Sequence, residues 1–249
     1  MLMEERFARI LSILEEQKSV TIQELMIRLE TSESTVRRDL NAMHEKGLLT
    51  KVYGGAVANQ SYFQTYDAKV SDRQKENMDE KQAIAKAAAS LIQPEDFVYL
   101  DAGTTTGMMI DYLTDTRTVF VTNAIGHAKR LSELGFRVYI LGGEFKSATE
   151  AIVGEEAMLS LDKYNFTLGF FGTNGISVKN GCTTPEVKEA SVKKKAISHC
   201  KRAYVLADKS KFRHVSSIMF AKFQEVNIIT EEGALENSKK YKNVWEVTK

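Results

Sequence analysis

The stretch TIQELMIRLETSESTVRRDLNAMHEKGLLTKVYGG, residues 21–55, carries two helix-like repeats of apolar residues and ends in a pair of glycines. Thr21, with Glu24 three residues later, has the pattern of a capping box that marks a helix start. Ser32 is a good N-cap for a second helix, and Gly47 is a good stop for it. Apolar residues recur at helical spacing here and in an earlier segment: Phe7, Ile10, Leu11, Leu14; Ile22, Leu25, Met26, Leu29; Val36, Leu40, Met43. We therefore expect three helices that share one small core.

Only Glu30, Thr31 and Ser32 separate the last two helices, a turn as short as that of a helix-turn-helix. Residues 48–57 follow as a short ribbon with a tight turn at its two glycines, which would let it approach a phosphate backbone. The pattern predicts a winged helix-turn-helix whose third helix reads DNA. Outward side chains on that helix and on the wing are suited to bond phosphates or base edges: Ser34, Thr35, Arg37, Arg38, Asn41, Lys51 and Tyr53.

The alternative for this segment is a three-helix module that docks onto protein. Residues 1–58 hold eight basic and nine acidic side chains, a net charge of −1, which is not the basic footprint of most nucleic-acid binders. Most of the acids, however, lie on the first two helices, whereas the basic residues Arg37, Arg38, Lys46 and Lys51 follow on the third helix and the wing. This distribution favours DNA.

Composition is that of a two-domain chain with buried cores: 249 residues, 43% of them apolar, and a formal net charge of +1. Cys182 and Cys200 are the two cysteines, with no metal-ligand spacing around them, so we expect neither a disulfide framework, a metal site nor a cofactor. Charged residues follow within the first ten residues, MLMEERFARI, and no apolar run is long enough to span a bilayer. We expect a cytoplasmic protein.

The pattern changes after the wing. Residues 58–78 are polar and weakly patterned, which suggests a linker between a DNA-binding domain at 1–57 and a second domain at 79–249. In the second domain short apolar strands alternate with helices near 80–91, 105–114, 125–134, 154–162 and 186–199, which predicts an α/β fold with a mostly parallel sheet. The expected strands are 97–100, 118–122, 137–141, 166–172, 202–207, 217–220 and 227–230.

Small, hydroxyl, amide and ammonium groups follow five of these strands, at the edge of a parallel sheet where ligands collect. DAGTTT at 101–106 opens a helix, and its free N–H groups and hydroxyls suit a phosphate. The carboxylates and amides suit sugar hydroxyls, so the joint pattern predicts a sugar-phosphate site. Its expected residues are Asp101, Gly103, Thr104, Thr105, Thr106, Thr122, Asn123, Gly142, Gly143, Thr173, Asn174, Glu186, Asp208, Lys209 and Lys211.

Three motifs resemble the signature of the DeoR family of bacterial transcriptional regulators: SESTVRRDL at 32–40, GLL at 47–49 and VYGGA at 52–56. The resemblance implies that the DNA-reading helix carries Ser34, Thr35, Arg37 and Arg38. Asp39 is expected to pair with a basic residue of the first helix. Tyr53 departs from the family pattern, where many members carry histidine.

Residues 78–231 resemble the sugar-phosphate sensor domain of the same family, which is related to ribose 5-phosphate isomerase and the coenzyme A transferases. DAGTTT resembles the isomerase phosphate loop, and ADKSKF at 207–212 resembles its lysine-bearing loop. GTNGI at 172–176 lacks the acids of the isomerase, and VKKK at 192–195 stands where the resemblance places the catalytic glutamate. Glu186 and Glu189 lie nearby and could substitute. Isomerisation needs a base, so the pattern favours binding without turnover.

These features resemble fructose-operon repressors most, through LDAGTTT, GTNGI, TTPE and VLADKSKF. The resemblance implies an oligomeric repressor, a dimer or tetramer, that a sugar phosphate such as fructose 1-phosphate releases from operator DNA. Residue chemistry does not separate that ester from other sugar phosphates. An isomerase-like enzyme with a docking module and an activator of the same operon stay open as alternatives.

Overall fold

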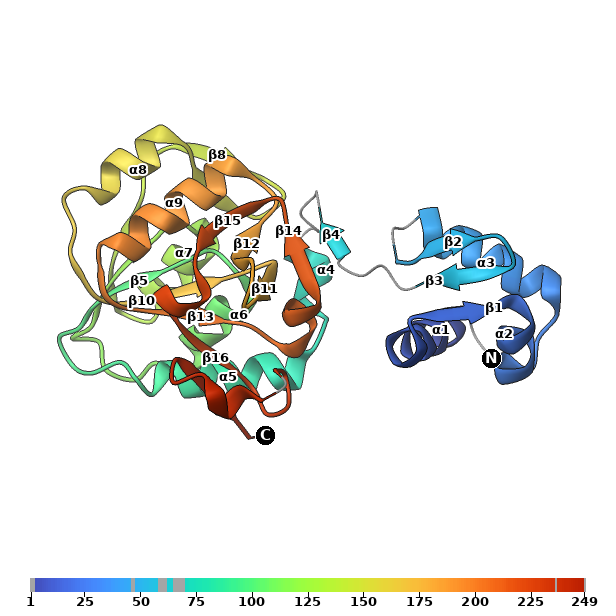
Figure 1. The fold of residues 1–249 in the computed structure, drawn as a ribbon. Helices are drawn as coiled ribbons and strands as arrows, with labels where there is room; N and C mark the ends of the chain where they lie inside the picture. The colour runs from blue at the N-terminus through green and yellow to red at the C-terminus, as the bar shows by residue number, and fades with distance from the viewer. Residues whose placement is uncertain (1–2, 46–47, 58–61, 65–69, 236, 249) are drawn as a thin grey trace. The chain divides into compact units, whose positions relative to one another are not determined.

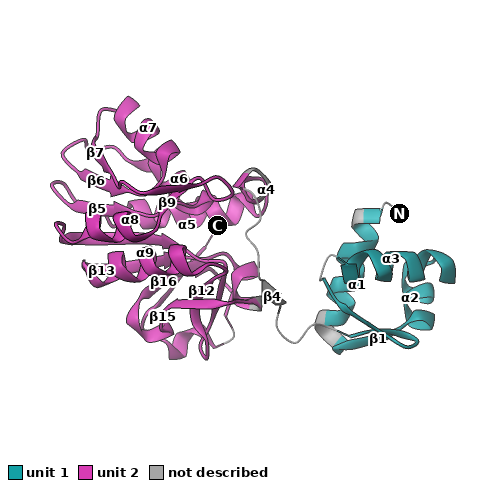
Figure 2. Ribbon diagram, turned by 90° about the horizontal axis from the view of Figure 1, so that it is seen from above, with its two compact units in different colours: residues 1–62 teal, residues 63–249 magenta. Residues whose placement is uncertain are grey.

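The structure is a computed structural model that describes residues 3–45, 48–57, 62–64, 70–235 and 237–248. The chain forms two compact units, residues 1–62 and 63–249, which Figures 1 and 2 show. The predicted helix stop at Gly47 lies outside the described residues.

Three helices and a small sheet make up the first unit, in the order α1 (Met3–Gln17), α2 (Ile22–Leu29) and α3 (Glu33–Glu45). The capping box at the start of α2 is confirmed, because the Thr21 hydroxyl accepts from the Glu24 N–H and the Glu24 carboxylate accepts from the Thr21 N–H. The predicted apolar residues meet in one buried cluster, with Leu11 and Met26 partly buried at its rim. The three-helix core is therefore confirmed.

The wing is a three-stranded antiparallel sheet in the order β1–β3–β2, with β1 at Ser19–Thr21, β2 at Thr50–Val52 and β3 at Gly55–Val57. Gly54 turns the chain at φ +85°, a conformation that glycine adopts without steric cost. Gly55 has a different reason: a Cβ there would lie 2.2 Å from the Val20 carbonyl oxygen of β1. The second glycine thus allows the close pairing of β3 with β1.

The second unit is built on a seven-stranded sheet in the order β17–β16–β13–β10–β5–β6–β7, and every neighbouring pair is parallel. Two buried clusters cover its faces: α8 and α9 contribute to one, and α5, the 3-10 helix η1 and α7 to the other. This confirms the predicted parallel α/β fold with covered faces. The strands are β5 (Phe97–Leu100), β6 (Val119–Thr122), β7 (Arg137–Ile140), β10 (Phe166–Gly172), β13 (Cys200–Leu206), β16 (Asn227–Glu231) and β17 (Val244–Val247). The helices are α4 (Val70–Gln74), α5 (Met78–Ala89), α6 (Thr104–Met108), η1 (Met109–Tyr112), α7 (Ile125–Glu133), α8 (Glu155–Leu161) and α9 (Val187–Ser198).

Several short strands form smaller sheets outside the parallel one. The predicted strand at 217–220 is β15 (Ile218–Ala221), which pairs antiparallel with β12 (Gly181–Thr184), and β12 pairs with β11 (Gly175–Ser177). β8 (Glu144–Lys146) pairs with β9 (Ala151–Val153), and β4 (Tyr62–Gln64) pairs with β14 (His214–Ser216). The remaining 3-10 turns are η2 (Lys209–Arg213), η3 (Phe223–Glu225) and η4 (Ser238–Lys240). Strand β4 and helix α4 are regular elements inside the segment that we predicted to be a linker.

Candidate functional site

The outward face of α3 carries the polar residues that the periodicity placed there. Ser34, Arg37, Arg38 and Asn41 are exposed, and Thr35 is half-buried. Arg37 pairs along the helix with Glu33 at 2.6 Å, whereas Arg38 has no hydrogen bond or ion pair with any residue in the described part of the chain. Arg38 is therefore the cation of α3 that is available to a phosphate or a guanine edge without breaking an internal contact.

The wing adds two more of the predicted DNA-binding residues to this surface. The Lys51 ammonium group donates to the Asn41 side-chain oxygen at 2.6 Å, which joins the wing to α3. Tyr53 is fully exposed at the wing tip, next to Gly54. The structure therefore brings α3 and the wing together into one surface of the first unit.

Asp39 lies on the opposite side of α3 and is buried. Its carboxylate accepts from Arg6 of α1 through two nitrogen atoms, at 2.6 Å and 3.1 Å. The expected pairing of Asp39 with a basic residue of the first helix is confirmed. This two-point contact fixes α3 against α1 and so orients the exposed face.

A second candidate site lies at the carboxyl edge of the parallel sheet. The strand order reverses between β5 and β10, and such a reversal opens a crevice in which α/β proteins bind ligands. Two cavities open here, with volumes of about 30 Å³ and 390 Å³. They share the loop Ala102, Gly103 and Thr104 that follows β5, so they meet at the predicted phosphate loop.

The smaller cavity is lined by four cationic side chains. Arg73 comes from α4, Lys81 from α5, Lys193 from α9 and Lys211 from the turn after β13. Burial lowers the pKa of Lys81, and the nearby charges of Lys211 and Arg73 lower it further, against an opposing effect of Asp208. Among the described residues the guanidinium of Arg73 has no partner, and its Nε is buried. This arrangement of charge suits an anion.

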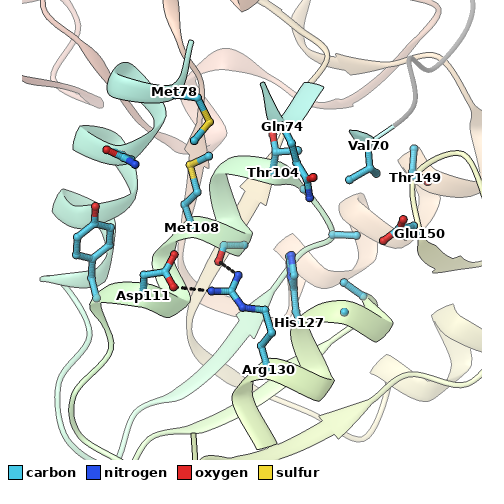
Figure 3. A pocket seen from close by; sticks show the side chains of 17 residues that line it. Val70, Gln74, Met78, Thr104, Met108, Asp111, His127, Arg130, Thr149 and Glu150 are labelled. Carbon is cyan, nitrogen blue, oxygen red and sulfur yellow. Dashed lines mark hydrogen bonds and ion pairs between the residues drawn. The ribbon is translucent and has the colours of Figure 1, made fainter. Parts of the chain in front are cut away.

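The larger cavity, which Figure 3 shows, has mixed walls. Met78, Met108 and Tyr112 give it an apolar side. On the other side Arg130 is already engaged, since it donates to the Gly107 carbonyl oxygen and pairs with Asp111. Burial and the neighbouring Arg130 lower the pKa of His127 to about 4, so His127 is neutral at neutral pH. The remaining polar lining residues, Gln74, Gln82, Thr149 and Glu150, suit hydroxyl groups better than a second phosphate.

Beneath the cavities lies a cluster of buried charges. Lys193 contacts the carboxylate of Asp101 and lies 3.5 Å from that of Glu189. Burial opposes the charged form of Lys193, but these two carboxylates outweigh it and raise its pKa. Glu189 is buried too, yet Lys193 and Lys146 lower its pKa. Lys193 and Glu189 are thus held in their charged forms, whereas burial raises the pKa of Asp101 against the opposing effect of Lys193.

Six predicted effector residues line the smaller cavity, and two of these line the larger one as well. Nine others do not line either cavity. The six are Gly103, Thr104, Thr105, Thr173, Asn174 and Lys211; the nine are Asp101, Thr106, Thr122, Asn123, Gly142, Gly143, Glu186, Asp208 and Lys209.

The side chains outside the cavities have partners within the protein. Asp101 accepts from the Gly172 N–H at 3.0 Å as well as from Lys193. Asn123 accepts from the Ala102 N–H at 2.8 Å and donates to the Ile152 carbonyl oxygen. Such bonds hold the shape of the phosphate loop, which a ligand then uses.

Other residues of these nine form hydrogen bonds in turns or ion pairs, or lie at the surface. The Thr106 hydroxyl donates to the Asp101 carbonyl oxygen, and the Thr122 hydroxyl accepts from the Ala124 N–H. Asp208 accepts from Asn77 and from Ser210. Glu186 pairs with Lys146, the Lys209 side chain is exposed, and Gly142 and Gly143 lie at the surface after β7.

Three of the four cavity cations were missed by sequence reasoning: Arg73, Lys81 and Lys193. Arg73 lies in a segment with weak periodicity, so nothing marked it as part of a site. Lys81 and Lys193 do carry a signal, because each occupies a buried position of its amphipathic helix. A lysine in such a position needs a partner or a function, and this rule would have identified Lys81 and Lys193 from the sequence.

Comparison with known proteins places this geometry in a family. Residues 6–62 match the DeoR-like helix-turn-helix domain, and residues 76–232 match the DeoR C terminal sensor domain. The chain is 41% identical to the uncharacterized HTH-type transcriptional regulator FruR of Bacillus subtilis, over 93% of this chain and 92% of that one. It is 35% identical to the lactose phosphotransferase system repressor of Staphylococcus epidermidis, over 98% of each.

Among solved structures, ribose 5-phosphate isomerase A of Methanocaldococcus jannaschii matches 55% of each chain, with 16% identity and a TM-score of 0.40. No helix among the described residues is long and apolar enough to cross a membrane. The two family matches together span both units, the first with the surface of α3 and the wing and the second with the crevice. The chain belongs to the DeoR family of helix-turn-helix transcriptional regulators.

Proposed function

We propose that this chain represses a sugar catabolic or transport operon and leaves its operator when a phosphorylated sugar binds to the second unit. The observation that carries the proposal is the cationic cavity at the switch point of the sheet, beside a larger cavity suited to hydroxyls. Fructose 1-phosphate is the ester that we propose, because LDAGTTT, GTNGI, TTPE and VLADKSKF resemble fructose-operon repressors. In the bacterial cell this regulation takes place in the cytoplasm, with the operator DNA.

The phosphate of the ligand is assigned to Arg73, Lys81, Lys211 and the loop at Gly103–Thr105. The smaller cavity alone, at about 30 Å³, cannot hold a whole sugar phosphate. The larger one, at about 390 Å³, falls in the usual range for small-molecule sites, roughly 300–1,000 Å³. The sugar hydroxyls therefore extend from the shared loop into the larger cavity.

Binding without turnover is part of the proposal. A general base must reach the proton that it removes. Asp101 and Glu189 are the buried carboxylates of the crevice, and both contact Lys193. Glu189 lines the smaller cavity but is also paired with Lys146, so its carboxylate is engaged by two cations. Asp101 also does not line either cavity. A purified protein that converts an aldose phosphate into a ketose phosphate would instead support the isomerase alternative.

Residues 1–57 bind the operator in this proposal, and residues 79–249 bind the sugar phosphate with help from Arg73 in the segment 58–78. The acting species is a homo-oligomer, a dimer or tetramer, whose winged helices occupy repeated half-sites. The sugar phosphate must favour the arrangement that does not bind DNA, because a ligand shifts an equilibrium only through unequal affinities.

Calorimetry against fructose 1-phosphate, fructose 6-phosphate, tagatose 6-phosphate and deoxyribose 5-phosphate tests the ligand. Operator retardation in the presence of each ester tests its effect on DNA binding. Lys211→Ala should weaken ester binding about tenfold, the loss expected for one charge-assisted hydrogen bond. Lys209→Ala is the matched control, because Lys209 is exposed and does not line either cavity. Equal losses in both variants would refute the assigned site, and tighter binding of another ester would refute fructose 1-phosphate.

A further inference from the structure

One wall of the larger cavity comes from the turn between β8 and β9, residues 147–150. Thr149 and Glu150 of this turn line the cavity, where Figure 3 labels them. Neither the Thr149 hydroxyl nor the Glu150 carboxylate has a hydrogen bond or an ion pair with any residue that the structure describes. The turn therefore brings two unpartnered polar groups to this wall.

The hairpin that carries the turn is fixed beside the phosphate loop. On β9, the Ile152 N–H donates to the Asn123 backbone carbonyl oxygen at 2.7 Å, and the Asn123 side chain donates to the Ile152 carbonyl oxygen at 3.3 Å. The same side chain accepts from the Ala102 N–H of the phosphate loop. On β8, Lys146 pairs with the buried Glu189 at 3.1 Å. Both strands are anchored, so the turn has a defined position relative to the phosphate loop.

Two features of the turn indicate a binding role. Glu150 has a left-handed backbone conformation, with φ at 52°, which disfavours residues other than glycine, asparagine and aspartate. Thr149 is buried, although a buried hydroxyl normally has a hydrogen-bond partner. Backbone strain and an unpaired buried hydroxyl in adjacent residues are typical of a site that is completed by a ligand.

The two cavities differ in the charge that their walls carry. Four cations line the smaller cavity against the one carboxylate of Glu189. In the larger cavity, the cation Arg130 pairs with Asp111, and the lowered pKa of His127, about 4, leaves that ring neutral at neutral pH. The carboxylate of Glu150 is the remaining charge of this wall, and it is not balanced by a cation.

This charge matters because the size of the larger cavity does not limit the ligand. A volume of about 390 Å³ leaves room for a sugar that carries a second phosphate. A phosphate dianion, however, offers acceptors alone and would meet the acceptor-only carboxylate of Glu150. A hydroxyl donates to that carboxylate instead. Charge and hydrogen bonding, rather than space, thus separate the two end groups.

We propose that Glu150 is a specificity-determining residue that selects sugar monophosphates over sugar bisphosphates. Its carboxylate accepts hydrogen bonds from hydroxyls at the end of the sugar remote from the phosphate, and it repels a second phosphate at that end. The ligand therefore binds in one direction, with its phosphate in the smaller cavity. The inference rests on the proposed function and adds which end group the larger cavity accepts.

Calorimetry with fructose 1-phosphate and fructose 1,6-bisphosphate, which differ by one phosphate group, tests this selection. The wild-type protein should bind the monophosphate at least about tenfold more tightly. Glu150→Gln keeps the size of the side chain and removes its charge. Because Glu150 is exposed, this change should lower the ratio of the two affinities by about fivefold. Glu150→Lys should lower the ratio further, whereas Glu150→Asp keeps the charge and should keep most of the selection.

Glu156→Gln is the matched control, because Glu156 is exposed and does not line either cavity. Its ratio of affinities should equal that of the wild-type protein. Equal binding of the two esters by the wild-type protein would overturn the inference while the proposed function stands. An unchanged ratio in both Glu150→Gln and Glu150→Lys would do the same. A wild-type protein that binds neither ester would overturn the inference and the proposed function together.

Discussion

The outward face of α3 and the carboxyl edge of the parallel sheet were both predicted to carry binding residues, but the structure uses them differently. On α3 all the predicted side chains except the half-buried Thr35 are exposed, and Arg38 has no hydrogen-bond or ion-pair partner among the described residues. At the sheet edge Asp101, Asn123 and Asp208 are buried and bonded within the protein. A polar residue on a helix is thus easier to assign to a ligand than one in a loop.

The reason lies in the backbone. A helix satisfies its own interior N–H and C=O groups, so its outward side chains are left for partners. A loop that turns at the end of a buried strand has backbone groups that need side-chain partners. Asn123, for instance, bonds the Ala102 N–H and the Ile152 carbonyl oxygen. Its amide stabilises the loop that would hold the phosphate.

The largest expected effect tests whether the buried charges of the second unit serve stability. Lys193→Met removes the cation between Asp101 and Glu189, which leaves the buried carboxylate of Asp101 without a cation while Glu189 keeps only Lys146. We expect a loss of about 3–5 kcal/mol in the free energy of unfolding, measured by urea denaturation of the second unit.

Lys194→Met is the control for this substitution, because Lys194 is exposed on the same helix. It should change the free energy of unfolding by no more than about 0.5 kcal/mol. Similar stabilities for the two variants would contradict a central role of Lys193. In that case the buried cluster would contribute no more to the free energy of unfolding than the exposed arginines of α3 do.

Periodicity and capping made most of the fold predictable. The predicted strand at 166–172 is β10 without a change of boundary. The predicted helix at 125–134 is one residue longer than α7, and the predicted helix at 186–199 is one residue longer than α9 at each end. The short strands β8, β11 and β17 were not predicted, because each contains a charged residue, a glycine or a serine and so lacks the continuous apolar run of the equally short β5 and β6. Arg73 and Lys81 escaped because α4 and α5 come to the phosphate loop only through tertiary packing.

Operator affinity should distinguish the two neighbouring arginines of α3. Arg38→Ala should cost about 1–3 kcal/mol of operator binding, whereas Arg37→Ala should cost less because Arg37 must first leave Glu33. Retardation titrations at one fixed salt concentration measure both. Fructose 1-phosphate affinity is the control and should not change. A larger loss of operator affinity in Arg37→Ala would show that the ion pair with Glu33 does not weaken the contact of Arg37 with DNA.

Two asparagines at the sheet edge test the distinction between loop and ligand contacts directly. Asn123→Ala removes a buried side chain and leaves the Ala102 N–H without its partner, which should lower the free energy of unfolding by about 1–3 kcal/mol. Asn174 lines the smaller cavity, and its side-chain oxygen accepts from the Thr184 hydroxyl at 3.2 Å. Asn174→Ala should therefore weaken ester binding, with a smaller loss of stability than Asn123→Ala because this bond joins two side chains rather than holding a backbone N–H. Thermal unfolding and calorimetry on both variants give the comparison. If Asn123→Ala weakened ester binding and Asn174→Ala caused the larger loss of stability, the roles assigned to the two asparagines would be wrong.

The smallest expected effect concerns pH. Burial and nearby cations lower the pKa of Lys81, so the empty site loses this proton at a lower pH than an ordinary lysine does. A bound phosphate favours the charged form, so ester affinity should fall as pH rises through that lowered pKa, by at most about tenfold for one such bond. Lys81→Arg keeps its charge throughout, so its affinity should begin to fall only at higher pH. Operator binding without ester should stay level in the same window, because Lys81 is not among the predicted DNA-binding residues. If ester affinity began to fall at the same pH in the wild-type protein and in Lys81→Arg, another lysine would be the cause. Lys81 would then be a residue that shapes the site without contacting the phosphate.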